Sequence, residues 1–398
     1  MSHPTAAIDT NVSMPELTRV LLDIYSVSGE EKTLADAIYQ ALETHPHLHL
    51  VRDGDAIIAR TDFGPQNGQQ RTRILLAGHL DTVPLPTVAG SLGTVPSRVV
   101  EEDGDWVLYG RGATDMKGGV AVQLKLAAEL TAHETDYDLT YIFYDNEEVA
   151  SEKSGLARLI RNHGELITDA DFGVLLEPTD GTIEGGCNGT LRVIARFPGR
   201  AAHSARAWMG LNAIHVMAPV IERIADYGNP VELVDGLEFR ESLSVVRVEG
   251  GMANNVIPEA ASMTVNYRFA PSKRADEALE WVRGLFEGAG ATIEVDDLCE
   301  GARPGADSDV AQRFLSVARQ VAATRGEELR LSAKVGWTDV ARFTQVGVPA
   351  MNFGPGDPLL AHTRDEHTPV SDIVKVHDTL RAFVLAQPAP MPAPHREA

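Results

Sequence analysis

The chain carries Ala77-Gly78-His79-Leu80-Asp81-Thr82-Val83-Pro84 directly after apolar residues that begin at Ile74. The apolar run predicts a buried strand that ends at the edge of a sheet, where loops often carry chemistry. His79 and Asp81 are two residues apart, so an extended chain places both side chains on one face. A histidine beside a carboxylate can open a metal site, because the second group can orient the first. When this pair is considered alone, His79 can instead be a structural residue that makes a hydrogen bond and binds no metal.

The composition indicates a globular protein of two domains. The chain has 398 residues, of which 43% are hydrophobic, and its mean hydropathy is −0.12. The formal net charge of −22 argues against nucleic acid or an anionic membrane as a partner, since both require a basic face. Two cysteines, Cys187 and Cys299, lie far apart, which argues against a disulfide framework and a thiolate zinc site. Neither a signal peptide nor a membrane-spanning run is evident, so we expect a cytoplasmic protein.

A glycine-rich stretch follows at residues 110–119, with the sequence Gly-Arg-Gly-Ala-Thr-Asp-Met-Lys-Gly-Gly. It precedes a helical pattern from about Lys117 to Ala132, and its glycines allow a tight loop that delivers Asp115 to the helix N-terminus. A plain N-cap is the alternative role for Asp115. Residues 85–109 contain glycines and prolines among polar residues, which predicts an excursion of the chain over the site.

Two further apolar runs end in carboxylates. The β-prone run over 141–144 leads into Asp145-Asn146-Glu147-Glu148, and an apolar strand over 172–176 leads into Glu177. Adjacent glutamates repel each other unless solvent screens them or a cation lies beside them. With a cation, one glutamate can bind the metal while the other transfers protons. Strands alternate with helices up to about residue 185, and the strand ends of an open α/β sheet share one edge, so we expect these groups to converge.

A different pattern begins at Leu191. We predict strands over 191–198, 242–249, 261–269 and 291–298 and helices over 210–227 and 276–288, in the ferredoxin-like order βαββαβ. This segment is long enough for a second domain, and its strand edge or helices offer a surface for a homodimer. The predicted division is a catalytic domain over 1–186 and 301–386, an inserted dimerisation or lid domain over 187–300, and a disordered tail over 387–398.

Late histidines complete a set of side chains that suits a metal. His362 and His367 lie between an apolar strand and a closing helix over 370–385. With the earlier histidine and carboxylates, they give two nitrogen and several oxygen ligands, which suit zinc or a similar divalent ion. A carboxylate shared by two ions would make the pair co-catalytic.

At these residues the chain resembles the M20 family of metallopeptidases and deacylases. The matched stretches are, in order, residues 78–84, 110–119, 145–148, 177–178 and 361–362, and the resemblance covers about residues 14–386. It implies a zinc-peptidase-like α/β catalytic domain with a mixed central sheet, together with the inserted α+β ferredoxin-like dimerisation domain. It also implies a homodimer that acts on a small acyl-amino-acid substrate.

The family pattern implies five ligands for two Zn²⁺ ions in each subunit, with Co²⁺ as a substitute. His79 and Glu177 would bind one ion, and Glu148 and His362 would bind the other. Asp115 would bridge the two ions.

The pattern also implies the groups that assist the metals. Asp81 would support the first ligand histidine, and Glu147 would be the general base and acid that activates the attacking water. His367 competes with His362 for the late ligand position. We prefer His362, because the family places its histidine just before a segment that ends in an acid and a glutamate, as residues 363–366 do.

The inserted domain resembles that of the family as well. Residues 199–204 contain His203 and resemble the segment whose histidine reaches across a dimer to touch the substrate and stabilise the oxyanion. The alternative for His203 is a surface or capping role. Arg268 is a candidate clamp for a substrate carboxylate, and its alternative role is an ion pair with an acidic residue inside the domain. Amides and guanidinium groups can hold a substrate carboxylate. The predicted substrate contacts are Asn254, Asn255, Arg268, Thr338 and Arg342.

Within the family, residues 183–192, 203–215 and 336–343 are most similar to desuccinylases of the actinobacterial type. This implies hydrolysis of N-succinyl-LL-2,6-diaminopimelate to succinate and LL-2,6-diaminopimelate, in lysine and diaminopimelate biosynthesis. Desuccinylases of the proteobacterial type carry an arginine pair where this chain has Cys187-Asn188. The grip on the substrate would then come from another arginine, such as Arg206, Arg268 or Arg342.

Other functions stay open at this point. A deacylase for N-acetylornithine or another N-acylamino acid, or a peptidase for short peptides, would share every metal ligand. A non-catalytic binding protein is disfavoured by Glu147, because a binder has no use for an acid–base group beside its ligands. A nucleotide-binding α/β protein is disfavoured because residues 110–112 match neither common phosphate-loop pattern.

Overall fold

The computed structural model describes residues 7–66, 68–132 and 134–385, which group into two compact units. The first unit comprises the described residues up to Ile183, Ala306–Arg330 and the described residues from Asn352 onward. The second comprises Glu184–Gly305 and Leu331–Met351. The first boundary lies close to the predicted one, but residues 331–351, predicted as part of the catalytic domain, group with the inserted segment. The predicted tail over 387–398 lies outside the described residues.

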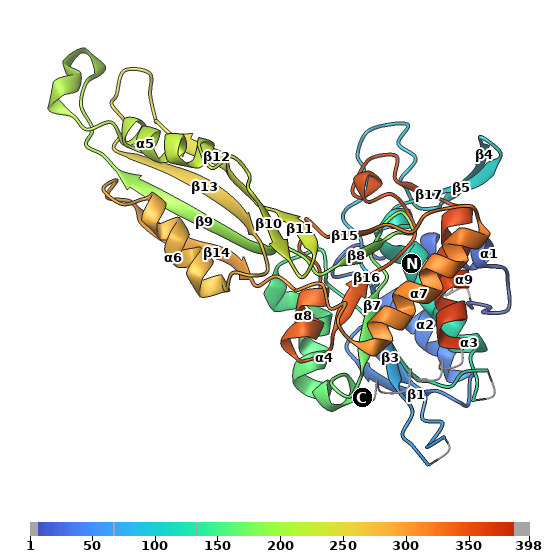
Figure 1. Ribbon diagram of the computed structural model, residues 1–398. Helices are drawn as coiled ribbons and strands as arrows, with labels where there is room; N and C mark the ends of the chain where they lie inside the picture. The colour runs from blue at the N-terminus through green and yellow to red at the C-terminus, as the bar shows by residue number, and fades with distance from the viewer. Residues whose placement is uncertain (1–6, 67, 133, 386–398) are drawn as a thin grey trace, which may run out of the picture. The chain divides into compact units, whose positions relative to one another are not determined.

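The first unit contains five strands of a large mixed sheet, in the order β1-β2-β6-β3-β7 (Figure 1). Neighbouring strands of β1, β2 and β6 are antiparallel, whereas β3 is parallel to both β6 and β7. The mixed central sheet expected from the sequence is therefore confirmed. The bounds of these strands are β1 (His49–Asp53), β2 (Ala56–Arg60), β3 (Arg73–His79), β6 (Asp138–Tyr144) and β7 (Phe172–Leu175).

The parallel strands bring the predicted site residues to one edge of the sheet. Every residue of β3 and β6 is buried, as expected for near-continuous apolar runs inside a covered parallel sheet. His79 lies opposite Tyr144 of β6, and Ala77 lies opposite Leu175 of β7. The residues that follow the three strands therefore begin at the same edge, as the sequence predicted.

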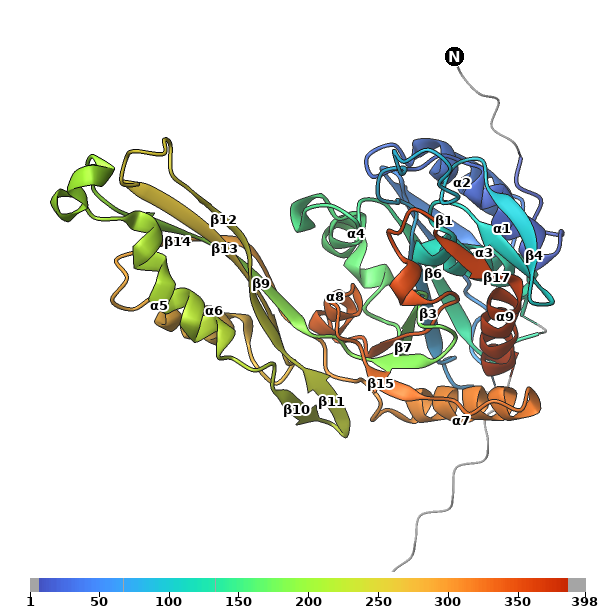
Figure 2. The ribbon, with the colours of Figure 1, turned by 90° about the horizontal axis from the view of Figure 1, so that it is seen from above.

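Helices cover both faces of this sheet. Figures 1 and 2 show α4 on one face and α3 with α9 on the other. The helix predicted after the glycine-rich stretch and the predicted closing helix are both present, within a few residues of their expected ends. The helices of the unit are α1 (Met14–Leu22), α2 (Lys32–Glu43), α3 (Gly118–Glu129), α4 (Gly155–His163), α7 (Asp309–Thr324) and α9 (Val370–Leu385), and the short helical turns are η1 (Ala113–Lys117), η2 (Ser151–Lys153), η3 (Gly164–Leu166) and η5 (Pro358–Leu360). None of the described helices is both long and apolar enough to cross a membrane.

Residues 85–109, predicted as an excursion of the chain over the site, contain a β-hairpin. The strands β4 (Arg98–Glu102) and β5 (Asp105–Tyr109) pair antiparallel across Asp103-Gly104, and β5 also pairs with β17 (His367–Pro369). Both turn residues have positive φ, 50° and 86°, which is the geometry that an Asp-Gly pair adopts in a two-residue hairpin turn. The pairing fastens this hairpin to the segment that carries the late histidines.

The second unit has the predicted ferredoxin-like connectivity. Its four-stranded antiparallel sheet has the order β12-β13-β9-β14. Figure 2 shows α5 and α6 side by side on one face of this sheet, where a core that includes Val193, Met217 and Val265 is buried. The elements are β9 (Gly189–Pro198), η4 (Ser204–Met209), α5 (Ala213–Ala225), β12 (Ser242–Gly250), β13 (Ala260–Phe269), α6 (Ala275–Leu285) and β14 (Thr292–Cys299).

This unit also contains a β-hairpin that was not predicted. The strands β10 (Val231–Val234) and β11 (Leu237–Arg240) pair across Asp235-Gly236, again with positive φ at both turn residues. The unit also contains β15 (Leu331–Ala333) and α8 (Val340–Gln345), and the chain passes between the units within β8 (Ile183–Gly185) and β16 (Ala350–Asn352). The assignment of this unit to dimerisation stays a prediction.

Candidate metal centre

Two groups of potential ligands lie at the edge of the first unit's sheet and share one carboxylate. His79, Asp115 and Glu177 form one group, and Asp115, Glu148 and His362 form the other. In each group the ligand atoms lie within 4.8 Å of one another. All five predicted ligands are therefore brought together, although the chain separates the first from the last by more than half its length.

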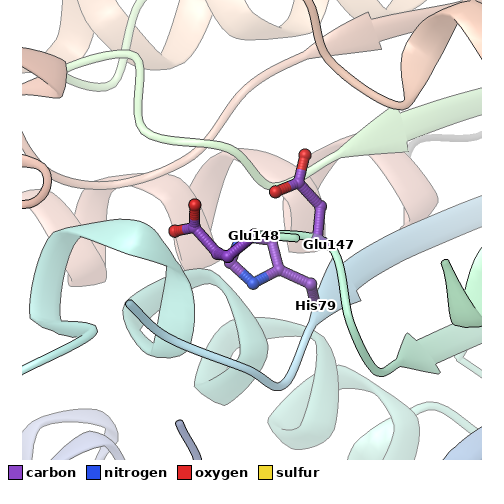
Figure 3. A group of neighbouring side chains, drawn as sticks. All are labelled: His79, Glu147 and Glu148. Atoms are coloured by element: carbon purple, nitrogen blue, oxygen red, sulfur yellow. The ribbon is translucent and has the colours of Figure 1, made fainter. Parts of the chain in front are cut away.

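The adjacent glutamates lie beside the same histidine. His79, Glu147 and Glu148 also offer ligand atoms within 4.8 Å of one another. Figure 3 shows the two carboxylates pointing in different directions from neighbouring backbone positions, near the His79 imidazole. This geometry allows one glutamate to bind a metal while the other faces a different group, as the sequence analysis expected.

Each ligand lies at or after the end of a strand, or in a short helical turn or loop. His79 is the last residue of β3, Asp115 lies within η1, and Glu148 follows β6. Glu177 lies two residues beyond the end of β7, and His362 lies between η5 and β17. Strand ends supply three of these positions, because parallel strands finish at a common edge.

Asp115 faces a different histidine with each of its oxygens. Its Oδ1 is 3.0 Å from Nε2 of His79, and its Oδ2 is 3.2 Å from Nε2 of His362. The same His362 nitrogen is 2.9 Å from Oε1 of Glu148. A carboxylate that presents one oxygen to each of two ligand groups has the arrangement of a bridging ligand in a two-metal site.

The electrostatics of the cluster favour positive charge. Burial is the largest effect on His79 and opposes its protonation, but the hydrogen bond to Asp115 and the negative charges of Asp115, Asp81 and Glu147 together outweigh it and raise the pKa of His79 well above its usual value. Hydrogen bonds to Asp115 and Glu148 raise the pKa of His362 to about 10. Burial raises the pKa of Glu148. The carboxylates thus attract protons to both imidazoles, and a divalent cation would compete for the same nitrogens, because a metal ligand must be a neutral imidazole.

The donor set fits a pair of zinc-like ions. His79 donates from Nδ1 to the carbonyl oxygen of Asp81 at 3.0 Å, which leaves Nε2 facing the shared carboxylate. Such a bond fixes the tautomer and orientation of a ligand histidine. Two imidazole nitrogens and three carboxylates without thiolates are the ligands of a catalytic zinc pair.

Asp81 contacts its neighbours in an unexpected way. Its carbonyl oxygen holds His79, whereas its Oδ1 is 3.6 Å from the His79 Nδ1. The carboxylate instead accepts hydrogen bonds from the backbone N–H groups of Glu147 and Glu148, at 2.9 and 3.0 Å. Asp81 is fully buried, so these bonds fix the loop that carries both glutamates.

His367, the competitor for the late ligand position, belongs to none of the ligand groups found among the described residues. Its Nδ1 donates to the carbonyl oxygen of Asp365 at 2.7 Å, and its ring packs against Tyr109. This geometry supports the choice of His362.

Glu366 and Arg111, which were not among the predicted site residues, form a buried ion pair with a nitrogen–oxygen distance of 2.7 Å. Glu366 also accepts hydrogen bonds from the backbone N–H groups of Thr114 and Asp115, both at 3.1 Å. The pair therefore holds the loop that delivers Asp115. Both residues stand inside motifs that the sequence analysis quoted, but only the fold shows that they meet.

The predicted substrate residues all belong to the second unit. Asn254 and Asn255 are exposed, and Thr338 is buried. Arg268 is half-buried, and burial lowers its pKa. Arg342 pairs with Asp339 at 2.6 Å and lies over the Trp337 ring.

Residues 187 and 188, which stand where the sequence analysis placed the arginine pair of proteobacterial desuccinylases, make contacts within the second unit. The Asn188 amide donates to the carbonyl oxygens of Arg240 and Val335, at 2.8 and 3.2 Å. Cys187 is fully buried, and burial raises the pKa of its thiol to about 11. Both residues are therefore structural in this chain.

Comparison with known proteins covers nearly the whole chain. A Mycobacterium tuberculosis (strain ATCC 25618 / H37Rv) protein, provisionally named succinyl-diaminopimelate desuccinylase DapE, is 46% identical over 370 residues, 93% of this chain and 97% of that protein. The succinyl-diaminopimelate desuccinylase of Corynebacterium glutamicum is 43% identical over 374 residues, 92% of this chain and 95% of that protein. The Bacillus subtilis YXEP protein, whose crystal structure is described as that of a dinuclear metal-binding peptidase from the M20 family, has a similar fold. The two structures superpose with a TM-score of 0.64 at 18% sequence identity, and the match covers 94% of this chain and 96% of that chain.

The family model described as peptidase family M20/M25/M40 matches residues 75–386. This stretch begins inside β3 and includes every residue of the two ligand groups. The length of the match and the identity to the two actinobacterial proteins show that this chain belongs to peptidase family M20/M25/M40.

Proposed function

We propose that the chain is a dizinc amidohydrolase that cleaves N-succinyl-LL-2,6-diaminopimelate to succinate and LL-2,6-diaminopimelate in the cytoplasm. The observation that carries the reaction class is the carboxylate of Asp115, shared by two ligand groups beside Glu147. The choice of substrate is supported by identity of 43–46% over more than nine tenths of the chain to proteins named as desuccinylases.

Five side chains would hold the metals: His79, Asp115, Glu148, Glu177 and His362. Two bound divalent cations would polarise the amide carbonyl and lower the pKa of the attacking water. Glu147 accepts a proton from that water as its oxygen attacks the carbonyl carbon. Glu147 then donates the proton to the amide nitrogen as the carbon–nitrogen bond breaks, which releases succinate and the free amine.

His203 would donate a hydrogen bond to the oxyanion that forms during the attack. Its Nδ1 accepts a hydrogen bond from the backbone N–H of Ala205 at 3.0 Å, so the neutral ring carries its proton on Nε2. That nitrogen is therefore a donor, as an oxyanion requires. The side chain is exposed in the single chain, which suits a contact with another subunit.

The second unit offers a surface for a second copy of the chain. β12 is an edge strand, and an edge strand presents unpaired backbone groups that favour pairing with another chain. Large apolar side chains are exposed on this strand, just beyond its end and within η4, and exposed apolar side chains of this kind mark an interaction site. They are Trp208, Met209, Val246, Val248 and Met252, with exposed fractions between 49% and 89%. We infer a homodimer through this surface, with His203 acting on the partner's substrate.

Mixing two inactive variants would test the contact across the dimer. If His203 serves the neighbouring active site, heterodimers of Glu147→Gln and His203→Ala contain one site with both residues intact. Random exchange of subunits should then restore about a quarter of wild-type activity. If both residues served one site of their own subunit, every site would lack one of them. Activity that stays at the level of the separate variants would contradict the proposal, with unmixed variants as the control.

The substrate is tested by comparing acyl-amino acids that share the same chemistry at the amide. We expect kcat/KM for N-succinyl-LL-2,6-diaminopimelate to exceed that for N-acetylornithine by at least about 100-fold, because unpaired polar groups in a site built for a larger acyl chain penalise the smaller one. Release of free amine measures both reactions. Equal or higher kcat/KM for N-acetylornithine would assign the chain to a different deacylase of the same family.

A further inference from the structure

The loop of the general base is held by residues from a distant part of the chain. Three successive backbone N–H groups, of Asn146, Glu147 and Glu148, each donate to a buried carboxylate. Asp81 receives the last two, and Oε1 of Glu31 receives the first at 3.2 Å. Asn146 has a φ of 58°, a left-handed conformation that costs free energy for a residue other than glycine unless its surroundings hold it.

The Asp81 carboxylate is itself held from the segment between α1 and α2. The hydroxyl of Ser28 donates to Oδ2 of Asp81 at 2.7 Å. The backbone of Ser28 donates to the carbonyl oxygen of Thr82 at 3.1 Å, which anchors the serine beside the residues that follow β3. Oε1 of Glu31 also accepts from the N–H of Gly29 at 2.9 Å, which closes this turn against the loop of the general base. Ser28 and Gly29, to which the sequence analysis gave no role, therefore lie against the loop of the general base.

We propose that Ser28 is a positioning residue for Glu147, acting through the carboxylate of Asp81. This inference rests on the proposed role of Glu147 in hydrolysis. Oδ2 of Asp81 has two donors, Ser28 and the Glu148 N–H, and together they orient the carboxylate so that Oδ1 receives the Glu147 N–H. Removal of the hydroxyl frees the carboxylate to rotate and loosens the direction of Glu147. A loss of this kind lowers the rate of the chemical step more than it weakens substrate binding.

The chain provides a matched control at Ser26. Ser26 is buried, whereas Ser28 is half-buried, and the Ser26 hydroxyl donates to the carbonyl oxygen of Leu80 at 2.7 Å. Ser26→Ala therefore removes one hydroxyl hydrogen bond between the same two segments, without touching the carboxylate that holds Glu147. Ser28→Thr keeps the hydroxyl and serves as the conservative variant.

The experiment compares zinc-loaded full-length variants for kcat, KM and bound zinc. Ser28→Ala should lower kcat about tenfold, as expected for a lost hydrogen bond to a charged group, with KM changed less than about twofold and zinc content equal to wild type. Ser28→Thr should recover most of the loss, and Ser26→Ala should keep kcat within about twofold. Equal kcat for the two alanine variants, or a loss that appears in zinc content, would overturn the proposal.

Amide hydrogen exchange separates this proposal from the proposed function. In zinc-loaded Ser28→Ala, the peptide that contains residues 146–148 should exchange faster than in wild type, whereas Ser26→Ala should leave its rate unchanged. If wild-type protein fails to hydrolyse the substrate, the function is wrong, and the exchange rates still report whether Ser28 holds the loop. Unchanged exchange in Ser28→Ala would refute the positioning role even in an active enzyme.

Discussion

Replacing Glu147 with glutamine is expected to lower kcat by about 10³-fold or more, because the variant loses the group that accepts and returns the proton. Glutamine has nearly the same volume and keeps the backbone N–H that donates to Asp81. The five ligands of the two metal groups do not include Glu147, so the variant should still bind two zinc ions per chain. A large loss of turnover with full metal content would separate proton transfer from metal binding.

The measurement is kcat together with zinc content after removal of unbound metal. Glu152→Gln is the matched control, since Glu152 lies exposed in η2 just beyond the same loop, and its neutralisation should leave kcat within about twofold. Turnover by Glu147→Gln near the wild-type level would refute the assignment of the general base. Loss of zinc in this variant would instead place Glu147 among the ligands.

Replacing Asp115 with asparagine should weaken binding at both metal positions. The carboxylate places one oxygen beside His79 and the other beside His362, and the substitution removes its negative charge and one acceptor oxygen. We expect the affinity for Zn²⁺ to fall by at least about 100-fold at each position, since a lost ligand costs more than a lost supporting residue. Activity at limiting zinc should fall in parallel.

Titration of the metal-free variant with zinc, in competition with a chelating dye, measures both affinities. Asp138→Asn is the matched control, because Asp138 is a buried carboxylate at the start of β6 that pairs with Arg73 and stands outside the ligand groups. That control can lose stability but should keep the affinity for zinc. If Asp115→Asn weakened only one of the two positions, Asp115 would be a terminal ligand and not a bridge.

The candidate site could be predicted largely because its ligands follow apolar runs. Buried parallel strands are recognisable as continuous apolar segments, and their ends must meet at one edge. This argument alone brought His79, Glu148 and Glu177 together. The glycine-rich loop placed Asp115 in the set, whereas the bridging role of Asp115 and the choice of His362 over His367 required the family resemblance.

The two missed hairpins had a local signal that composition obscured. Each turn is an Asp-Gly pair between short β-prone runs, and Asp and Gly both tolerate the positive φ that such turns require. Around Asp103, the glycines and prolines among the polar residues of 85–109 led to the prediction of an excursion over the site. Turn chemistry was the more informative feature in both places.

The contacts by which distant segments hold the loops of the site could not be predicted. Ser28 and Asp81 are 53 residues apart, and Arg111 and Glu366 are 255 residues apart. The sequence contains these residues but no periodicity that relates them, since their meeting depends on how α1, β3 and β17 pack. For the same reason, the sequence analysis expected the Asp81 carboxylate to support His79, whereas its carbonyl oxygen makes that contact.

The central claim is tested most directly by release of succinate from N-succinyl-LL-2,6-diaminopimelate before and after metal removal. The account predicts turnover by zinc-loaded protein, its loss after exhaustive treatment with a chelator, and its recovery when Zn²⁺ is returned. Recovery should require two ions per chain, in keeping with the two ligand groups that share Asp115. Absence of succinate release by fully zinc-loaded protein, or turnover that survives complete metal removal, would contradict the account.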